Sequence, residues 1–424
     1  MNSFILHGDI CWPADGRLKA MENAYAICVD GISRGVFPVI PEQYAGLPTE
    51  EAAGQLIIPG MVDLHVHAPQ YSFNGLGMDL ELLDWLKAYA FPEEARYRDI
   101  GYAEKAYGLF VRDLQASATT RACIFATVHR DATELLMRML DATGLSTFVG
   151  KINMDRDAPE DLREANAYIS AFDTFGWLND INGKLQYTRP ILTPRFLPSC
   201  SDTLLNELRE VLHAYDLPVQ SHLSENPGEV ELVKRLFPQA AFYGDGYDAY
   251  DMFGSAGKTI MAHCIYSVPE EVECLRKNGV FVAHCPASNM NLCSGIAPVR
   301  RYLNRGIRVG LGTDVAGGES LSVFRAIANA IQVSKLYWRL ADQNCAPLTF
   351  DEAFEMATVR GGEFFGKVGS LEEGYEFDAV VIRDESLNSA TRRTLHERLE
   401  RAVYRDATGL ITAKYCQGRK VWSV

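Results

Sequence analysis

The chain lacks the short signatures that mark many nucleotide-binding and hydrolytic sites. It has no GxGxxG dinucleotide fingerprint, no Walker phosphate loop and no GxSxG nucleophile elbow. A glycine-rich stretch, DVAGGES (residues 314–320), does not follow a phosphate-loop pattern. These absences argue against a Rossmann dehydrogenase, a P-loop NTPase and a serine hydrolase of the elbow type.

Paired cysteines, a secretory leader and long apolar runs are absent as well. Ten cysteines lie singly between Cys11 and Cys416 without a CxxC pair, which suits reduced thiols better than disulfides or a structural zinc site. The start MNSFILHGDI has no basic region, and no apolar stretch is long enough to span a bilayer. We therefore expect a cytoplasmic protein that does not associate with membranes.

The charge is acidic but spread along the chain. The formal net charge is -14, with no block of one sign, which argues against nucleic acid or an anionic membrane as partner. A hydrophobic content of 47% and a charged content of 23% are ordinary for a soluble protein. The 424 residues suffice for one large α/β domain and a small one.

Eight apolar segments, each followed by a helical pattern, dominate the middle of the chain. The expected strands cover residues 57–66, 119–127, 146–154, 187–193, 218–223, 258–263, 279–284 and 307–313. Strands that alternate with helices predict a parallel sheet, and eight such units predict a closed (β/α)8 TIM-like barrel. Short strands at both ends of the chain are expected to pair as a small β-sandwich domain. We expect the boundaries 1–58 and 368–424 for that domain and 59–367 for the barrel.

Residues 68–98 are too long for an ordinary loop after a strand, and they contain the helix-like run LELLDWLKAYA. A long insertion at the mouth of a barrel often covers the active site. We therefore expect a lid here.

Two histidines one residue apart, His65 and His67, end the first expected barrel strand. Alternation places them with Asp63 on one face and Val62, Leu64 and Val66 on the other. By itself an HxH pair is more often structural than functional. Further histidines and an aspartate at other strand ends change this interpretation.

Polar side chains end four of the expected strands, namely His65 and His67, His222, His263 and Asp314. In a barrel all carboxyl ends face one mouth, so these residues converge. Neutral imidazoles and a carboxylate suit zinc or ferrous iron. The pattern predicts one metal ion, but leaves open whether His263 is a ligand or bonds to the metal-held water.

Glu225 follows His222 by three residues, in QSHLSEN. Alone, such a glutamate would usually cap the helix expected from Asn226. Beside a metal ligand it can instead transfer protons, as the non-ligand glutamate of metal hydrolases does, and we favour this role.

Three further residues are candidates for substrate binding. Arg195 cannot ligate a metal but can bind a carbonyl or ring-nitrogen edge, and Phe196 offers a stacking surface. Gln70 can read an amide-like edge with a donor and an acceptor. Lys184 lies too early to bridge two metal ions, which favours a single ion.

The remaining histidines lie outside this group. We expect His284 to form a hydrogen bond in the barrel mouth without being a ligand. No role is expected for the others, which are His7, His129, His213 and His396.

The chain resembles the amidohydrolase superfamily in five segments, which occur in this order: PGMVDLHVH, HLSE, AHC, HCPASN and GLGTDVAGG. Within this superfamily the chain resembles the guanine deaminase branch more closely. The segments that carry this resemblance are HVHAPQY, WLKAYAFPEEA, GKINMDRDAP, TPRF and HCPASNMNLCSG. The resemblance runs from about residue 55 to 383. Thr193 and Cys264 depart from the pattern, which has Ser and often Gly at these places.

The resemblance implies a fold, a reaction and roles for individual residues. It implies one Zn²⁺ (with Fe²⁺ as the other possibility) bound by His65, His67, His222 and Asp314. Glu225 would be the general acid/base, and His263 and Asp314 would align the metal-bound hydroxide that converts guanine to xanthine and ammonia. Purine-contacting residues would be Gln70, Arg195, Phe196, His222 and Glu225. The resemblance also implies a homodimer.

Two other functions remain open on the sequence alone. A sister deaminase acting on another aminopurine, a pterin or a triazine would use the same metal site. A non-catalytic barrel acting as a scaffold is a rival from a different class, since a fold alone does not prove activity. Such a scaffold would be expected to have lost ligands or the glutamate, and this chain keeps them all.

Overall fold

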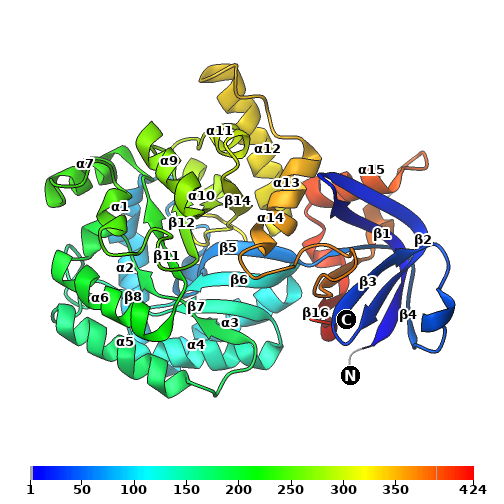
Figure 1. Cartoon of the computed structure of the whole chain (residues 1–424), viewed down its shortest axis with the longest axis horizontal. Helices are drawn as coiled ribbons and strands as arrows, with labels where there is room; N and C mark the ends of the chain where they lie inside the picture. The colour runs from blue at the N-terminus through cyan, green and yellow to red at the C-terminus, as the bar shows by residue number, and fades with distance from the viewer. Residues whose placement is uncertain (1–2, 388) are drawn as a thin grey trace.

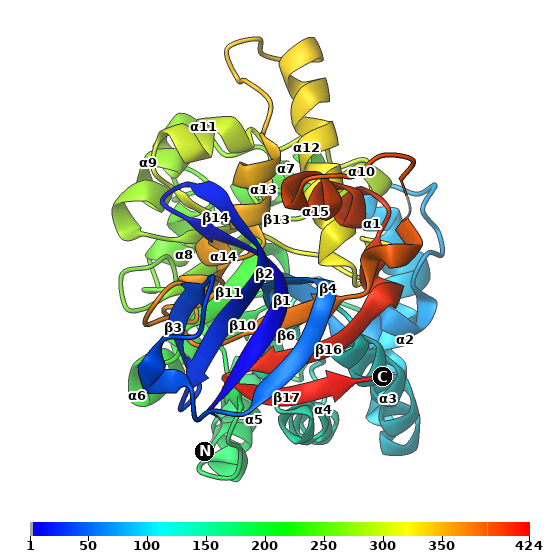
Figure 2. The same cartoon turned by 90° about the vertical axis from the view of Figure 1, so that its right-hand side faces the viewer.

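Seven strands from the two ends of the chain form one sheet in the computed structural model, which describes residues 3–387 and 389–424 (Figures 1 and 2). The strands, in the order β17-β16-β15-β4-β1-β2-β3, are β1 (Phe4–Ala14), β2 (Arg17–Val29), β3 (Ile32–Phe37), β4 (Thr49–Pro59), β15 (Ala379–Ile382), β16 (Ile411–Cys416) and β17 (Arg419–Ser423). β4 pairs with β15 in antiparallel register, Ile58 facing Val380. The expected pairing of the two chain ends is therefore present.

The middle of the chain contributes strands that pair only in parallel. One sheet holds β5 (Met61–His67), β6 (Thr119–Phe125), β7 (Ser146–Gly150) and β9 (Thr188–Pro190). A second holds β11 (Val219–Leu223), β12 (Thr259–His263), β13 (Phe281–His284) and β14 (Arg308–Leu311). The short strands β8 (Ile152–Asn153) and β10 (Thr193–Pro194) pair with each other.

Backbone hydrogen bonds join these sheets at both seams. Leu192 forms a parallel bridge with Val219 of β11. At the other seam the Asp314 N–H donates to the His65 carbonyl at 2.8 Å, and the His67 N–H donates to the Val315 carbonyl at 3.1 Å. The residues that follow β14 therefore lie directly against β5.

Apolar side chains from the two four-stranded parallel sheets meet in one buried cluster. Its members are Val62, Leu64, Cys123, Phe148, Ile191, Ile260, Ala262, Phe281, Ala283, Cys285, Phe364, Phe365 and Val368. Burying these side chains together holds the strands in one mixed α/β unit. It also brings the carboxyl ends of the strands close to one another.

Three of the expected strands are divided in the structure. The segment 57–66 breaks at Gly60, where a side chain would lie 2.3 Å from Thr120 Oγ1, so its first residues belong to β4. The segment 146–154 becomes β7 and β8, and the segment 187–193 becomes β9 and the start of β10. In each case one continuous apolar run of the sequence contributes residues to two different strands.

The simple alternation predicted for β5 is also wrong. Its pairing with β6 shifts register between Asp63 and Val66. Val62 and Leu64 lie in the inner cluster described above, whereas Val66 lies in another. An irregularity of this kind redirects side chains, and here it immediately precedes His67.

Helices follow the parallel strands and cover them (Figure 1). They are α3 (Ile100–Ala116), α4 (Arg130–Thr143), α5 (Ala167–Ile181), α6 (Asp202–Tyr215), α7 (Pro227–Leu236), α8 (Asp245–Asp248), α9 (Pro269–Asn278), α10 (Pro286–Asn291), α11 (Val299–Asn304), α12 (Val323–Leu340), α13 (Phe350–Met356) and α14 (Val359–Gly362). A further helix, α15 (Leu395–Tyr404), packs instead on β1, β2 and β4 of the terminal sheet. Within the described residues, no helix is both long and apolar enough for a membrane span. No disulfide joins any of the cysteines there either.

The insertion after β5 is largely helical. A 3-10 turn (Ala68–Phe73) leads to α1 (Leu82–Trp85), a π-helical turn (Leu86–Ala90) and α2 (Phe91–Ala95). We call residues 82–95 the cover segment. Its side chains Leu82, Trp85 and Leu86 line the cavity described below, which places the segment over the ends of the strands.

A buried ion pair fastens the terminal sheet to β6. Arg121 of β6 donates from Nε to Asp378 Oδ2 at 2.7 Å and from Nη2 to Asp378 Oδ1 at 3.0 Å. Asp378 precedes β15, and its Oδ1 also accepts from the Gln417 N–H at 2.8 Å. The Asp378 carboxylate thus accepts hydrogen bonds from Arg121 of β6 and from Gln417 of the C-terminal segment.

Replacing Asp378 with Ala should destabilise the protein by about 3 kcal/mol, because it removes the bidentate partner of the buried Arg121 and the acceptor of the Gln417 N–H, and leaves Arg121 only its contact with Glu376 at 2.8 Å. Urea unfolding followed by circular dichroism would measure the loss. Asp161→Ala is the matched control, since Asp161 pairs with Arg98 on the surface at 3.6 Å. We expect that change to stay within about 0.5 kcal/mol. Equal effects of the two substitutions would contradict the anchoring role.

Candidate active site

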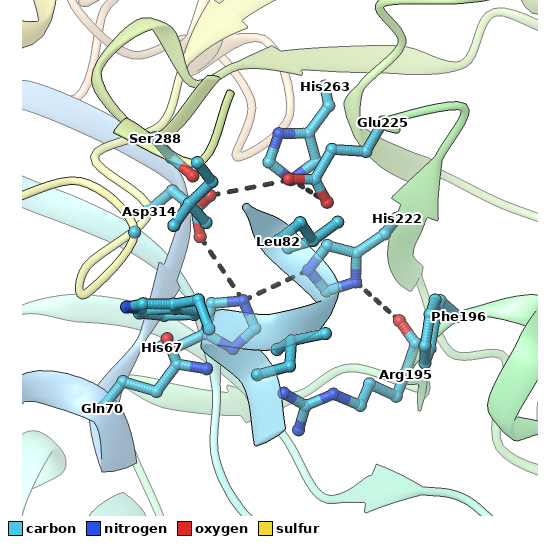
Figure 3. A pocket seen from close by; sticks show the side chains of 14 residues that line it. His67, Gln70, Leu82, Arg195, Phe196, His222, Glu225, His263, Ser288 and Asp314 are labelled. Carbon is cyan, nitrogen blue, oxygen red and sulfur yellow. Dashed lines mark hydrogen bonds and ion pairs between the residues drawn. The ribbon is translucent and has the colours of Figure 1, made fainter. Parts of the chain in front are cut away.

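A cavity at the carboxyl ends of the parallel strands brings the predicted site residues together (Figure 3). Its lining comprises His67, Gln70, Leu82, Trp85, Leu86, Arg195, Phe196, His222, Glu225, His263, Ser288, Leu292, Asp314 and Gly317. His65 is fully buried beside it. Every predicted site residue therefore lies in or against this one cavity.

The histidines and Asp314 enter the site from the ends of four parallel strands. His65 and His67 belong to β5, His222 to β11 and His263 to the last position of β12. Asp314 comes three residues after β14. The shared parallel direction of these strands explains why residues far apart in sequence meet.

The imidazoles and the carboxylate lie within a few ångströms of one another. His65 Nε2 and His67 Nε2 are 3.1 and 3.5 Å from Asp314 Oδ1. His67 Nε2 is also 3.2 Å from His222 Nε2, a contact visible in Figure 3. His263 Nε2 is 3.6 Å from Asp314 Oδ2. The four imidazoles therefore direct nitrogens at a single small volume.

Hydrogen bonds orient two of these rings. The His222 Nδ1–H donates to the Arg195 carbonyl at 2.6 Å, and the His263 Nδ1–H donates to Asn289 Oδ1 at 2.8 Å. In both rings the Nε2 lone pair then faces the cavity. Hydrogen-bond partners of metal-ligating histidines commonly fix the tautomer and the ring orientation in this way. Asn289, in the HCPASN motif, was missed by the sequence analysis, because only the structure shows that it contacts His263.

Several buried nitrogens at this place lack a hydrogen-bond partner among the described residues. They are His65 Nδ1 and Nε2, His67 Nδ1 and His263 Nε2. Burial and the neighbouring imidazoles lower the pKa of His67 and of His222 well below the usual value, so both rings are neutral. Neutral, unpartnered imidazoles beside a carboxylate fit a divalent cation such as zinc.

Possible ligand atoms fall into two overlapping groups, each within 4.8 Å. One contains His65, His67 and His222, and the other contains His65, His263, Cys285 and Asp314. Cys285 was not predicted. Burial raises the pKa of its thiol well above the usual value, and Sγ donates to the Ala283 carbonyl at 3.5 Å. A neutral thiol is a poor ligand, which leaves the histidines and Asp314 as the better donor set.

The backbone around the site is strained. His263 has φ 71° and Asp314 has φ 50°, in the left-handed region that side chains other than glycine seldom adopt. Such strain clusters at functional sites, where the surrounding structure imposes it. Here it occurs at the last residue of β12 and three residues after β14, where both side chains line the cavity.

Asp63 links the two strands on which the site depends. Its Oδ2 accepts from Thr313 Oγ1 at 2.5 Å, and its Oδ1 accepts from the N–H groups of Thr313 (3.0 Å) and His65 (3.2 Å). Burial raises the pKa of Asp63 to about 6. The carboxylate therefore fixes His65 relative to the residue that precedes Asp314.

Glu225 faces the cavity rather than the helix that follows it. Its Oε1 accepts from Ser294 Oγ at 3.2 Å, and its Oε2 lies 3.4 Å from His263 Nε2. Asn226 caps α7 in a capping box with Glu229, so the alternative capping role for Glu225 is wrong. Burial and the nearby Asp314 charge raise the pKa of Glu225 to about 8. A carboxyl group in this environment can hold and release a proton near neutral pH.

The predicted substrate-contacting residues share a partner that the sequence analysis missed. Arg195 forms a bidentate ion pair with Glu94 of α2, through Nη1 to Oε2 and through Nη2 to Oε1, the latter at 3.0 Å. Gln70 Nε2 donates to the same Oε1 at 2.8 Å. Glu94 occurs in the FPEEA motif, but nothing in its spacing indicated which glutamate faces inward.

His7, His129, His213 and His396 lie outside the cavity lining, as expected. His7, His213 and His396 pair with carboxylates outside it. His284 is buried, yet neither ring nitrogen has a hydrogen-bond partner in the described chain, so the predicted hydrogen bond is wrong. It lines a separate small cavity together with Arg300 and Tyr337, which explains why it does not reach the mouth.

The amidohydrolase family matches this chain over residues 56–418. That span includes all the parallel strands and every polar residue of the cavity. The chain belongs to the amidohydrolase family.

Its relatives within this family include several guanine deaminases. The enzyme of Homo sapiens is 39% identical over 347 residues, covering 79% of this chain and 74% of the relative. That of Dictyostelium discoideum is 36% identical over 379 residues, covering 88% and 83%. A crystal structure of guanine deaminase from C. acetobutylicum, with guanine bound in its active site, is 44% identical and covers 99% of this chain and 100% of that one, with a TM-score of 0.96.

We expect His67→Ala to weaken metal binding by more than about 100-fold, because loss of even an outer-shell partner of a ligand costs about 10–100-fold. Titration of the metal-free protein with Zn²⁺ would measure this. His213→Ala provides the control, since His213 lies on the surface of α6. Unchanged zinc affinity in His67→Ala would remove His67 from the ligand set.

Proposed function

We propose that this chain is a metal-dependent guanine deaminase that hydrolyses guanine to xanthine and ammonia. The observation that carries the proposal is the single cavity in which unpartnered imidazoles, Asp314 and Glu225 lie beside Arg195, Gln70 and Phe196. Its support from relatives is the guanine bound in the active site of the C. acetobutylicum enzyme.

The residues that would hold the metal are His65, His67, His222 and Asp314, with zinc as the expected ion and ferrous iron as the alternative. When bound, such an ion acts as a Lewis acid that makes water nucleophilic at neutral pH. His263, oriented by Asn289, lies between Asp314 and Glu225 and would align the attacking water.

Glu225 would carry the protons of the reaction. It would first protonate the ring nitrogen beside C2 of guanine, which makes that carbon electrophilic. As the C2–O bond forms, the attacking water gives a proton to Glu225 or Asp314, and that group passes it to the exocyclic amine. The C2–N bond breaks, ammonia leaves, and the remaining hydroxyl proton returns to Glu225 as the C2 carbonyl forms. Glu225 and Asp314 both border the cavity and lie on either side of His263, so both can reach one substrate atom.

The opposite side of the cavity would hold the purine. Arg195 and Gln70 offer N–H donors to the carbonyl and ring-nitrogen edge, and Phe196 offers a flat apolar surface. Leu82, Trp85 and Leu86 of the cover segment close the cavity from above and would exclude bulk water.

The remaining expectations complete the proposal. The seam hydrogen bonds and the shared inner cluster support a closed (β/α)8 barrel over 59–367. The terminal sheet is compatible with a small β-sandwich domain made of 1–58 and 368–424. A homodimer, as the family resemblance implies, and a cytoplasmic location, as the sequence predicts, are part of the same proposal.

The decisive experiment measures metal content and xanthine formation from guanine on one preparation. We expect about one zinc or iron per chain, xanthine and ammonia in equal amounts, loss of activity on chelation and recovery on adding Zn²⁺. Adenine, isoxanthopterin, a triazine and cytosine serve as comparison substrates. Faster turnover of one of these would favour a sister deaminase. Absence of both metal and turnover would favour the scaffold.

Glu225→Gln should retain the metal but turn over guanine about 10²–10⁴-fold more slowly, because it cannot supply the proton. Xanthine formation and metal content are measured together. Glu231→Gln, the same change on the exposed side of α7, should be as active as the unmodified enzyme. Near-normal turnover in Glu225→Gln would exclude Glu225 as the acid/base.

A further inference from the structure

We propose that Glu94 is a positioning residue that makes the cavity select neutral purines and links this selection to the closed cover segment. The inference rests on the proposed function, because it assigns the partner of the two residues expected to hold the purine edge.

Glu94 fixes the Arg195 guanidinium in one plane. Both Nη atoms donate to its two carboxylate oxygens, and both side chains are almost completely buried. The guanidinium also lies over the Phe91 ring, with Cζ 5.1 Å from its centroid. Bidentate pairing and stacking leave Arg195 one orientation, so its remaining N–H donors have set directions.

Glu94 also decides which way the Gln70 amide faces. Gln70 Nε2 donates to Glu94 Oε1 at 2.8 Å, and Gln70 Oε1 accepts from the Ala316 N–H at 3.1 Å. A flipped amide would place oxygen against the carboxylate and nitrogen against an N–H donor. Gln70 therefore keeps one free N–H and one lone pair in a fixed arrangement for reading the purine edge.

The pair has a consequence for charge. The Arg195 guanidinium is always protonated, and the Glu94 carboxylate balances it within the wall of the cavity. A neutral purine carbonyl can then accept a hydrogen bond without an unpaired positive charge nearby that would attract anions. Without Glu94 the same wall would favour an ionised ring, since specificity depends on what a site disfavours as much as on what it binds.

Glu94 and Phe91 both belong to the cover segment, whereas Arg195 follows β10 and Gln70 follows β5. The selective arrangement therefore exists only while the cover segment is in place. An open segment would take the Glu94 carboxylate away and leave both purine-reading side chains unoriented.

The test compares guanine with 8-azaguanine, which has the same shape but loses a ring proton more readily because nitrogen replaces C8. Ratios of kcat/KM are measured at a pH where 8-azaguanine is ionised and guanine is not. For Glu94→Gln we expect KM for guanine to rise at least about tenfold, with a smaller change in kcat. We expect the preference for guanine over 8-azaguanine to fall at least about fivefold. A purely structural defect would weaken both substrates alike.

Two further variants separate the explanations. Glu94→Asp keeps the negative charge and should preserve the preference for guanine even if its KM rises. Glu93→Gln is the matched control, because Glu93 pairs with Tyr102 and Arg96 away from the cavity lining. An unchanged preference in Glu94→Gln, or the same loss in Glu94→Asp, would overturn the inference.

The dissociation constants of guanine and 8-azaguanine are also measured, with and without Glu94→Gln, in a protein that carries Glu225→Gln. Turnover does not consume the ligand in that protein. This binding arm does not depend on catalysis, so it tests Glu94 even if the unmodified enzyme forms no xanthine. In that case the proposed function fails, whereas the role of Glu94 is still decided by the two constants.

Discussion

The seam between β5 and the residues after β14 is the constraint on which the site depends. Asp63 accepts hydrogen bonds from Thr313 and from the His65 backbone, and the His65 carbonyl accepts from the Asp314 N–H. These contacts join segments 250 residues apart. The three donors offset part of the cost of burying the Asp63 carboxylate, and the carboxylate sets the distance between the HxH pair and Asp314.

The sequence predicted the part of the site that follows from strand ends. The positions of His65, His67, His222, His263 and Asp314 after apolar runs sufficed, because parallel strands share one direction and their ends must meet. The division of single apolar runs into two strands was harder to predict. Nothing in the apolar run 57–66 shows that Gly60 lies so close to Thr120 that the chain must pass from one sheet to another there.

The residues that orient others were not predictable in the same way. No fixed sequence spacing relates Asn289 or Glu94 to its partner. Each meets its partner because elements that are distant in sequence pack together. His284 shows the converse. It ends a strand like the others, yet its ring turns toward α12 and not toward the mouth, because alternate residues of a strand face opposite sides.

The two halves of the cavity differ in how their charges are compensated. Around His65, His67 and His222 several nitrogens lack partners, and burial lowers the pKa of His67 and His222 so that these two rings are neutral, so this half is built to receive a cation. Around Arg195 the charge is already balanced by Glu94, so this half is built to receive a neutral group. Because Glu94 belongs to the cover segment, the segment that covers the cavity with Leu82, Trp85 and Leu86 also orients Arg195 and Gln70. One element therefore combines the exclusion of water with the orientation of these two side chains, whereas the residues of the metal-binding half come from other elements.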